Sequence, residues 1–334
     1  MTRYAELHCH TNYSFLDGAS WAGELVQRAA DLGYEALAIT DHDGFRGAVQ
    51  AHAHARELGF PLVYGTEIGM RRESQAGDHD LDEILAPGDT DIPITGEGDL
   101  TRRGRARRMH GVKPTRKAEA DHLVLLAPDP AGYAAIGRFV TRGQFRGRKD
   151  EPRYSYRDLE EAARHGSLVA LSGCWQGAVP RAAQQGDVLA ALEHAARLRD
   201  LFDGRFFIEL THHGMPGDDK RNDLLAEVAM RLGIETVATN NVHYAHRHDA
   251  DLSEVLAAIG GRRSLDEHDG FRPATDLRHL RTPDEMRARF ERYPGAVERA
   301  ADLGAALAFD LDLLAPELPD FPLPGSFTTC LLYT

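Results

Sequence analysis

Short apolar runs alternate with amphipathic segments over about the first 245 residues, and this alternation constrains the fold more than any other feature. The apolar runs have the length of strands, which we predict at 4–8, 36–39, 61–64, 122–127, 167–171, 205–210 and 235–239. The longer amphipathic segments predict helices at 20–32, 45–58, 131–142, 187–202 and 219–232. Such strand-helix repeats predict an α/β protein with a parallel sheet, either open or closed into a barrel.

Polar residues recur where the predicted strands end. In a strand-helix barrel the C-terminal ends of all strands meet at one rim, and functional sites are built there. We therefore predict one site from the side chains that close these strands. They are His8, His10, His42, Glu67, Cys174, Glu209, His212, His213, Asn241 and His243, with Asp17 in the run that follows the first strand.

The residue types at this rim indicate metal chemistry. His8 and His10 form a His-x-His pair, which places both imidazoles on one side of an extended segment. Two imidazoles, a carboxylate that can bridge and a thiolate suit Zn²⁺, Mn²⁺ or Fe. Several adjacent ions can bind a phosphate and lower the pKa of a bridging water, which then attacks phosphorus.

Taken singly, these residues have simpler interpretations. A His-x-His pair in a chain with 17 histidines is equally compatible with satisfied polar side chains, and Cys174 alone with a small buried hydrophobe. Glu209, His212 and His213 either line the mouth of the site or cap a strand. The joint arrangement carries the prediction, and no single residue does.

Composition excludes several classes of protein. The net charge is 39 − 52 = −13, so the chain lacks the basic balance of a free-standing nucleic-acid binder. Metals or a larger polypeptide would have to supply the attraction to phosphate. No apolar run approaches the ~20 residues that cross a bilayer, which argues against a membrane partner. The 3 widely spaced cysteines exclude a disulfide scaffold and predict a cytoplasmic location.

Two parts of the chain depart from the repeating pattern. Residues 70–120 have no apolar period and turn from acidic to basic, so we predict a mobile insertion there. Its basic half is either a solvated charge run or a DNA contact. Beyond residue 245 the pattern becomes helical, at 249–259, 283–293 and 296–309, before a proline-rich stretch. We expect 1–245 to form the barrel and 246–324 a helical linker.

The motifs at the strand ends resemble those of a known family. Residues 7–19, in which His-x-His precedes Tyr-Ser-Phe-Leu-Asp-Gly-Ala, resemble the first motif of the PHP (polymerase and histidinol phosphatase) domain in bacterial DNA polymerase III alpha subunits. The other motifs of this domain are resembled by residues 39–43, 65–67, 122–127, 171–174 and 237–244. The likeness runs from residue 4 to about 324. Residues 208–214, 262–267, 293–298, 309–311 and 315–319 point to the error-prone DnaE-type branch used in damage-induced mutagenesis.

This resemblance implies a fold and a ligand set. The fold is a distorted (β/α)7 barrel, followed by helices that lead toward a polymerase palm. Up to three divalent metals would be held, the first by His8, His10, Glu67 and Asn241, the second by Glu67, His122 and Cys174, and the third by Asp17, His42 and His243. Asn241 departs from the usual aspartate and is a neutral, weaker ligand. His122 begins its predicted strand where the other ligands end theirs, so its place rests on the resemblance alone.

The resemblance also implies an activity for the parent protein. It would be an error-prone DNA polymerase acting in replication and translesion repair, with DNA, the remaining polymerase domains and other damage-tolerance proteins as partners. The barrel would act as a 3′–5′ exonuclease. Residues 325–334 match nothing expected, so we interpret the chain as truncated or frame-shifted before its nucleotide-adding domain. A metal-poor structural scaffold and a free-standing small-molecule phosphatase are the alternatives, and Asn241 is the residue that separates exonuclease from scaffold.

Overall fold

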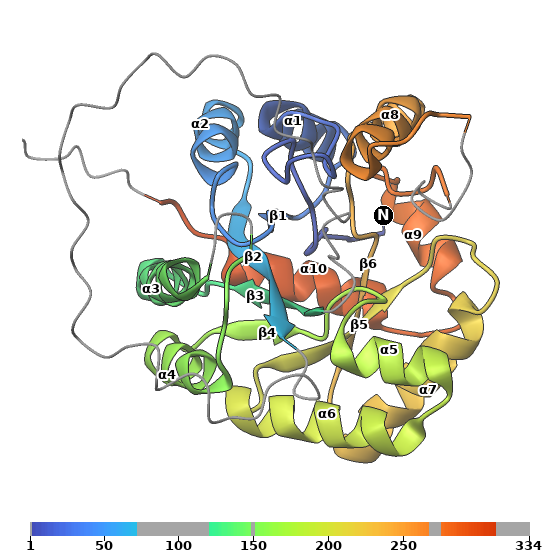
Figure 1. Ribbon diagram of the computed structural model, residues 1–334. Coiled ribbons are helices and arrows are strands. Elements are labelled where there is room, and N and C mark those ends of the chain that lie inside the picture. The colour runs from blue at the N-terminus through green and yellow to red at the C-terminus, as the bar shows by residue number, and fades with distance from the viewer. Residues whose placement is uncertain (1, 72–119, 148–150, 267–274, 312–334) are drawn as a thin grey trace, which may run out of the picture.

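The structure is a computed structural model that describes residues 2–71, 120–147, 151–266 and 275–311. Strands lie at the centre, and helices surround them (Figure 1). The strands are β1 (Leu37–Ile39), β2 (Leu62–Arg71), β3 (Ala120–Leu126), β4 (Val169–Leu171), β5 (Phe206–Thr211) and β6 (Thr236–Thr239). The helices are α1 (Ala22–Asp31), α2 (Ala48–Leu58), α3 (Pro130–Arg146), α4 (Tyr156–Gly166), α5 (Ala178–Gln185), α6 (Val188–Phe202), α7 (Asp218–Leu232), α8 (Ala250–Gly261), α9 (Pro283–Arg289) and α10 (Ala296–Leu307).

The six strands form one curled sheet in the order β1-β2-β3-β4-β5-β6. The predicted strand at 4–8 is an extended segment held by isolated bridges on both sides. The Ala38 N–H donates to the Glu6 carbonyl over 2.8 Å, and the Val242 N–H donates to the His8 carbonyl over 2.8 Å. The segment thereby joins β1 at one edge of the sheet to the chain after β6 at the other, as the expected distorted barrel requires.

The prediction of a parallel sheet is wrong for β3. This strand runs antiparallel to both β2 and β4, whereas the β1–β2, β4–β5 and β5–β6 pairs are parallel. Parallel neighbours need a crossover that returns the chain to the far end of the sheet. Here Arg71 lies opposite Ala120, so the chain leaves β2 and enters β3 at the same rim. The start of β3 therefore meets the ends of the parallel strands, which accounts for the place of His122.

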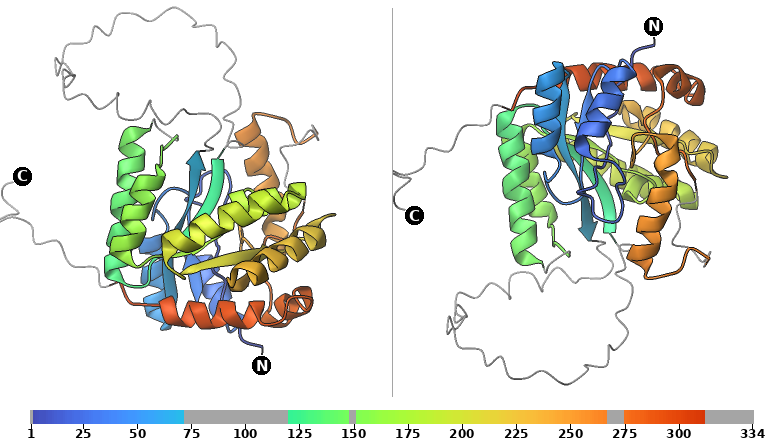
Figure 2. Two further views of the ribbon diagram at one scale, coloured as in Figure 1. Left: turned by 90° about the horizontal axis from the view of Figure 1, so that it is seen from below. Right: turned by 90° about the horizontal axis from the view of Figure 1, so that it is seen from above.

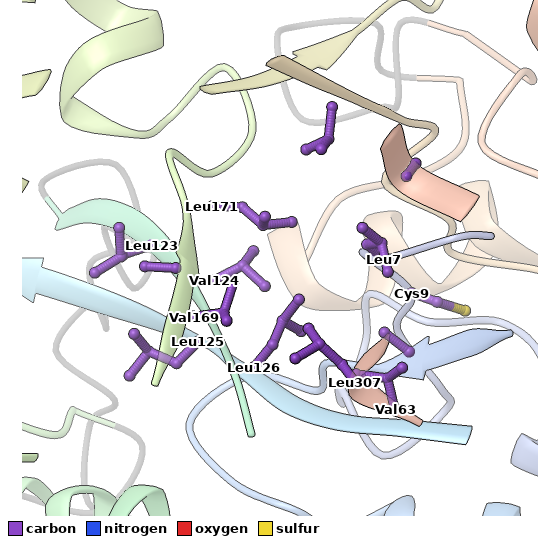
Figure 3. Close-up of a cluster of buried hydrophobic side chains, with 14 of the residues drawn as sticks. Leu7, Cys9, Val63, Leu123, Val124, Leu125, Leu126, Val169, Leu171 and Leu307 are labelled. Atoms are coloured by element: carbon purple, nitrogen blue, oxygen red, sulfur yellow. The ribbon is translucent and has the colours of Figure 1, made fainter. Parts of the chain in front are cut away.

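Helix α10 covers the end of the barrel opposite this rim, as the side views show (Figure 2). Its close approach depends on Gly304, because a Cβ there would lie 2.5 Å from the Cβ of Ala5. Leu307 reaches the same buried cluster as Leu7 and Leu126 (Figure 3). The far end of the barrel is therefore filled by apolar packing, which leaves the strand-end rim for polar chemistry.

Most predicted helices match within a few residues, but the sequence analysis missed α4 and α5. Helix α9 ends at Arg289, earlier than predicted, because the chain turns at Phe290–Tyr293. The predicted mobile insertion falls largely on 72–119, and the tail 325–334 within 312–334, so both lie outside the described residues. The division at residue 245 stays a prediction.

Candidate metal centre

Glu67 lies at the centre of the polar rim. It sits in β2, and its side chain is only 2% exposed. One carboxylate oxygen, Oε2, lies 3.5 Å from His8 Nε2 and 3.2 Å from His10 Nε2. The two Nε2 atoms are 3.1 Å apart, so the His-x-His pair faces one point. His8, His10 and Glu67 thus form a buried three-residue group that could hold a metal ion.

The other oxygen of Glu67 faces a second group. Oε1 lies 2.6 Å from His122 Nδ1 and 3.6 Å from Cys174 Sγ. The turn after β4 brings Cys174 there, and it depends on Gly173, which has a φ of +81°. A Cβ on Gly173 would lie 2.4 Å from the His122 carbonyl oxygen, so only glycine permits the approach. Glu67, His122 and Cys174 form a second potential metal group, and Glu67 belongs to both.

Glu209 orients His8 through the ring nitrogen that does not face Glu67. Its carboxylate lies in β5, is 1% exposed, and stands 2.7 Å from His8 Nδ1. Thr239 donates a hydrogen bond to the same carboxylate oxygen. A carboxylate that accepts from one ring nitrogen fixes the tautomer and leaves the other nitrogen free for a metal. The structure therefore places Glu209 behind the histidine, where the sequence suggested the mouth of the site or a strand cap.

Buried carboxylates attract positive charge at this end of the site. Burial alone would raise the pKa of Glu67, but the imidazoles of His122 and His8 outweigh it and hold that pKa well below its usual range. Burial would likewise lower the pKa of His8, but Glu209 and Glu67 raise it well above its usual range. The same negative field that favours a proton on His8 favours a metal cation, whose binding releases that proton.

Asp17 forms the opposite end of the site. Its two oxygens lie 2.6 Å from His42 Nε2 and 3.4 Å from His243 Nε2. His42 also contacts Glu67, with Nδ1 3.2 Å from Oε2, and therefore links the two ends. Asp17 follows Leu16, a non-glycine residue with a φ of +63°, so a strained turn directs the carboxylate to the rim.

The backbone of Asn241 and the side chain of Arg278 flank His243 at this end. The backbone carbonyl of Asn241 accepts from His243 Nδ1 over 2.8 Å. The side-chain oxygen of Asn241 is buried and has no hydrogen-bond partner among the described residues. Arg278 Nη1 lies 3.3 Å from His243 Nε2. Sequence reasoning missed Arg278, because it lies beyond the predicted barrel and no spacing links it to a strand end.

His212 and His213 contact residues outside the two metal groups. His213 Nε2 donates to the backbone carbonyl of Asn240 over 2.7 Å, and burial lowers the pKa of His213 well below its usual range. His212 Nε2 lies 3.2 Å from Asp219 at the start of α7. His212 therefore contacts the start of α7, and His213 joins the turn after β5 to the residue after β6.

The family assignment rests on the matched length of the chain. Residues 6–213 match the model of the PHP domain, which is more than half of the sequence. The chain belongs to the PHP family. The resemblance found at the strand ends is thereby confirmed, together with the curled α/β fold that it implied.

Named relatives of this PHP domain are DNA polymerases. The chain is 40% identical over 327 residues to the error-prone DNA polymerase of Mycobacterium bovis, a match that covers 97% of this chain and 26% of that protein. It is 30% identical over 328 residues to the DNA polymerase III subunit alpha of Treponema pallidum, covering 98% of this chain and 25% of that one. The chain therefore spans about a quarter of the length of these relatives.

A solved structure from Bifidobacterium adolescentis, described as a metal-dependent phosphoesterase, is similar with a TM-score of 0.42 and 17% identity. The likeness covers 86% of this chain and 96% of that one.

Within the described ranges of the PHP chain, none of the helices combines the length and apolar character that crossing a bilayer requires.

Proposed function

We propose that this chain is the PHP portion of an error-prone DnaE-type polymerase, and that it hydrolyses phosphodiester bonds at the 3′ end of DNA with divalent metals. One observation carries the proposal. The buried Glu67 carboxylate faces two separate donor groups, one oxygen toward His8 and His10 and the other toward His122 and Cys174. A carboxylate in this position can serve two ions, as a polynuclear phosphoesterase site requires.

The donor atoms fit such ions. His8, His10 and Glu67 would hold one, and Glu67, His122 and Cys174 another, since imidazole, carboxylate and thiolate suit Zn²⁺, Mn²⁺ or Fe. The family pattern adds Asp17, His42 and His243 as a third set, with Asn241 beside His8 and His10. When bound, divalent ions polarise a phosphate and lower the pKa of a coordinated water.

The residues of the chain prepare the site for that chemistry. Glu209 keeps the proton of His8 on Nδ1, which leaves Nε2 directed at Glu67. The Asn241 carbonyl likewise keeps the proton of His243 on Nδ1. Cys174 and Glu67 are nearly inaccessible to solvent, so competing water is excluded from their donor atoms. Such preorganisation lowers the cost of assembling charged groups around a cation.

The polymerase parent is proposed from the relatives. They support a protein in which further domains, outside this chain, add nucleotides during replication and damage tolerance, with DNA and those domains as partners. A cytoplasmic location is proposed as well, since the cysteines described, Cys9 and Cys174, are both free thiols.

An exonuclease assay tests the proposed activity. The purified chain, supplied with Mn²⁺, is incubated with single-stranded DNA labelled at its 3′ end. We expect release of labelled nucleotides, which stops on chelation and in Glu67→Gln. Metal bound at full occupancy without any release would contradict hydrolysis.

That result would favour the second candidate, a PHP scaffold that stabilises the polymerase without turnover. The neutral side chain of Asn241 favours this second candidate. An amide oxygen supplies no negative charge, and here it is buried without a partner among the described residues.

A further inference from the structure

Arg278 lies at the rim because the chain after the barrel folds back on it. The His243 N–H donates to the Arg278 carbonyl over 2.8 Å, and Tyr244 and His279 form a parallel bridge beside it. Asn240 holds the same segment through its side-chain amide, which donates to the carbonyls of Leu277 and His279 over 2.8 and 2.7 Å. The backbone of Arg278 is therefore fixed next to His243.

The guanidinium of Arg278 donates a hydrogen bond to the nitrogen of His243 that a metal would need as a ligand. His243 Nδ1 donates to the Asn241 carbonyl, so Nε2 is left as an acceptor. Arg278 Nη1 lies 3.3 Å from that nitrogen and donates to it. Arg278 Nε is buried and, among the described residues, has no hydrogen-bond partner. The guanidinium is thus held at the Asp17–His243 end by its contact with the histidine.

Charge separates this end from the Glu67 groups. Arginine keeps its positive charge at any pH a protein tolerates. A divalent ion on His243 would compete with Arg278 for one nitrogen and stand within a few ångströms of a like charge, in a partly desolvated site. His8, His10, His122 and Cys174 face the Glu67 carboxylate, which favours a cation. Asp17, His42 and His243 do not form a metal group of comparable closeness within the described part of the chain.

We propose that the guanidinium of Arg278 is the resident cation at the Asp17–His243 end, so that this site takes two metal ions and not three. The inference rests on the proposed function, because it assumes ions at the Glu67 groups. It assigns Arg278 the part of the third ion: a positive charge beside His243, whose Nε2 lies 3.4 Å from Asp17.

Metal stoichiometry tests this inference. The full chain and its variants are equilibrated with Mn²⁺, freed of unbound metal and analysed for manganese per chain. Arg278→Met removes the charge and keeps most of the side-chain length, whereas Arg278→Lys keeps a charge. Arg247→Met is the matched control, since Arg247 contacts the same segment as Arg278 but pairs with Asp276 over 2.7 Å. We expect two ions in the wild type, Arg278→Lys and Arg247→Met, and three in Arg278→Met.

The outcomes separate this inference from the proposed function. Three ions in the wild type, or two in a folded Arg278→Met, would overturn the role of Arg278 and leave metal binding at Glu67 intact. The wild-type count needs no variant, so a failure of Arg278→Met to fold does not protect the inference. A wild type without metal would contradict the proposed function and this inference together.

Discussion

The two ends of the site differ in how their carboxylates are held. Glu67 lies in a strand, is 2% exposed, and contacts imidazoles and a thiol. Asp17 lies in a loop, its side chain is 32% exposed, and a guanidinium stands beside its histidine partner. Burial in low dielectric strengthens the pull of a carboxylate on a cation, and solvent weakens it. We therefore expect Glu67 to attract a cation more strongly than Asp17 does.

The largest expected effect comes from Glu67→Gln compared with His243→Gln. Glu67→Gln removes a charge shared by both metal groups, so metal affinity should fall more than ~100-fold, beyond the ~10–100-fold typical of outer partners. His243→Gln should lower it far less, because Arg278 already supplies the positive charge at that end. Isothermal titration with Mn²⁺ measures both values.

Glu6→Gln is the control for burial. Glu6 is fully buried but bonds to the Tyr4 hydroxyl and to backbone N–H groups, so its loss should lower stability and spare the metal. Equal loss of metal in Glu67→Gln and His243→Gln would remove the distinction between the two ends.

The next effect concerns the support of His8. Glu209→Leu removes the acceptor 2.7 Å from His8 Nδ1, and metal affinity at the His8–His10 group should fall ~10–100-fold. Glu209→Gln keeps an acceptor oxygen and should lose much less. Competition with a fluorescent zinc chelator measures both. Unchanged affinity in a folded Glu209→Leu would mean that His8 is positioned without it.

The smallest effect is a gain. Asn241→Asp adds a negative charge where an amide oxygen is now buried without a partner among the described residues, so metal affinity on the His8–His10 side should rise about tenfold. Asn241 has a φ of +42°, which aspartate also tolerates, so the fold should be kept. Metal content and nucleotide release are measured together. A variant that gains neither would favour the scaffold.

The sequence predicted which residues share the rim because strand ends are a local property. The His-x-His spacing and residues 65–67 predicted His8, His10 and Glu67 at strand ends without any knowledge of pairing, and the structure brings their donor atoms together. The position of His122 could not be derived this way, because it depends on β3 running antiparallel. The direction of a strand depends on which strands it pairs with. The hydrophobic pattern of a single segment does not show that pairing.

The partners of the site residues were harder to predict than the residues themselves. Glu209 was recognised as a strand-end carboxylate, but its hydrogen bond to His8 joins residues 201 positions apart. Arg278 reaches His243 only because the chain after the barrel folds back over the rim. Helices α4 and α5 were not predicted, and Gly177, the residue before α5, has no side chain that could cap the helix. Long-range packing, and not local propensity, decided these features.

Anomalous X-ray scattering from crystals of the zinc-loaded chain tests the central claim most directly, because it locates each ion without reference to activity. The account predicts one peak among His8, His10 and Glu67 and another among Glu67, His122 and Cys174, each about 2.0–2.3 Å from its donor atoms. It predicts no peak on His243 beside Arg278. Zinc bound between Asp17 and His243, with none beside Glu67, would contradict it.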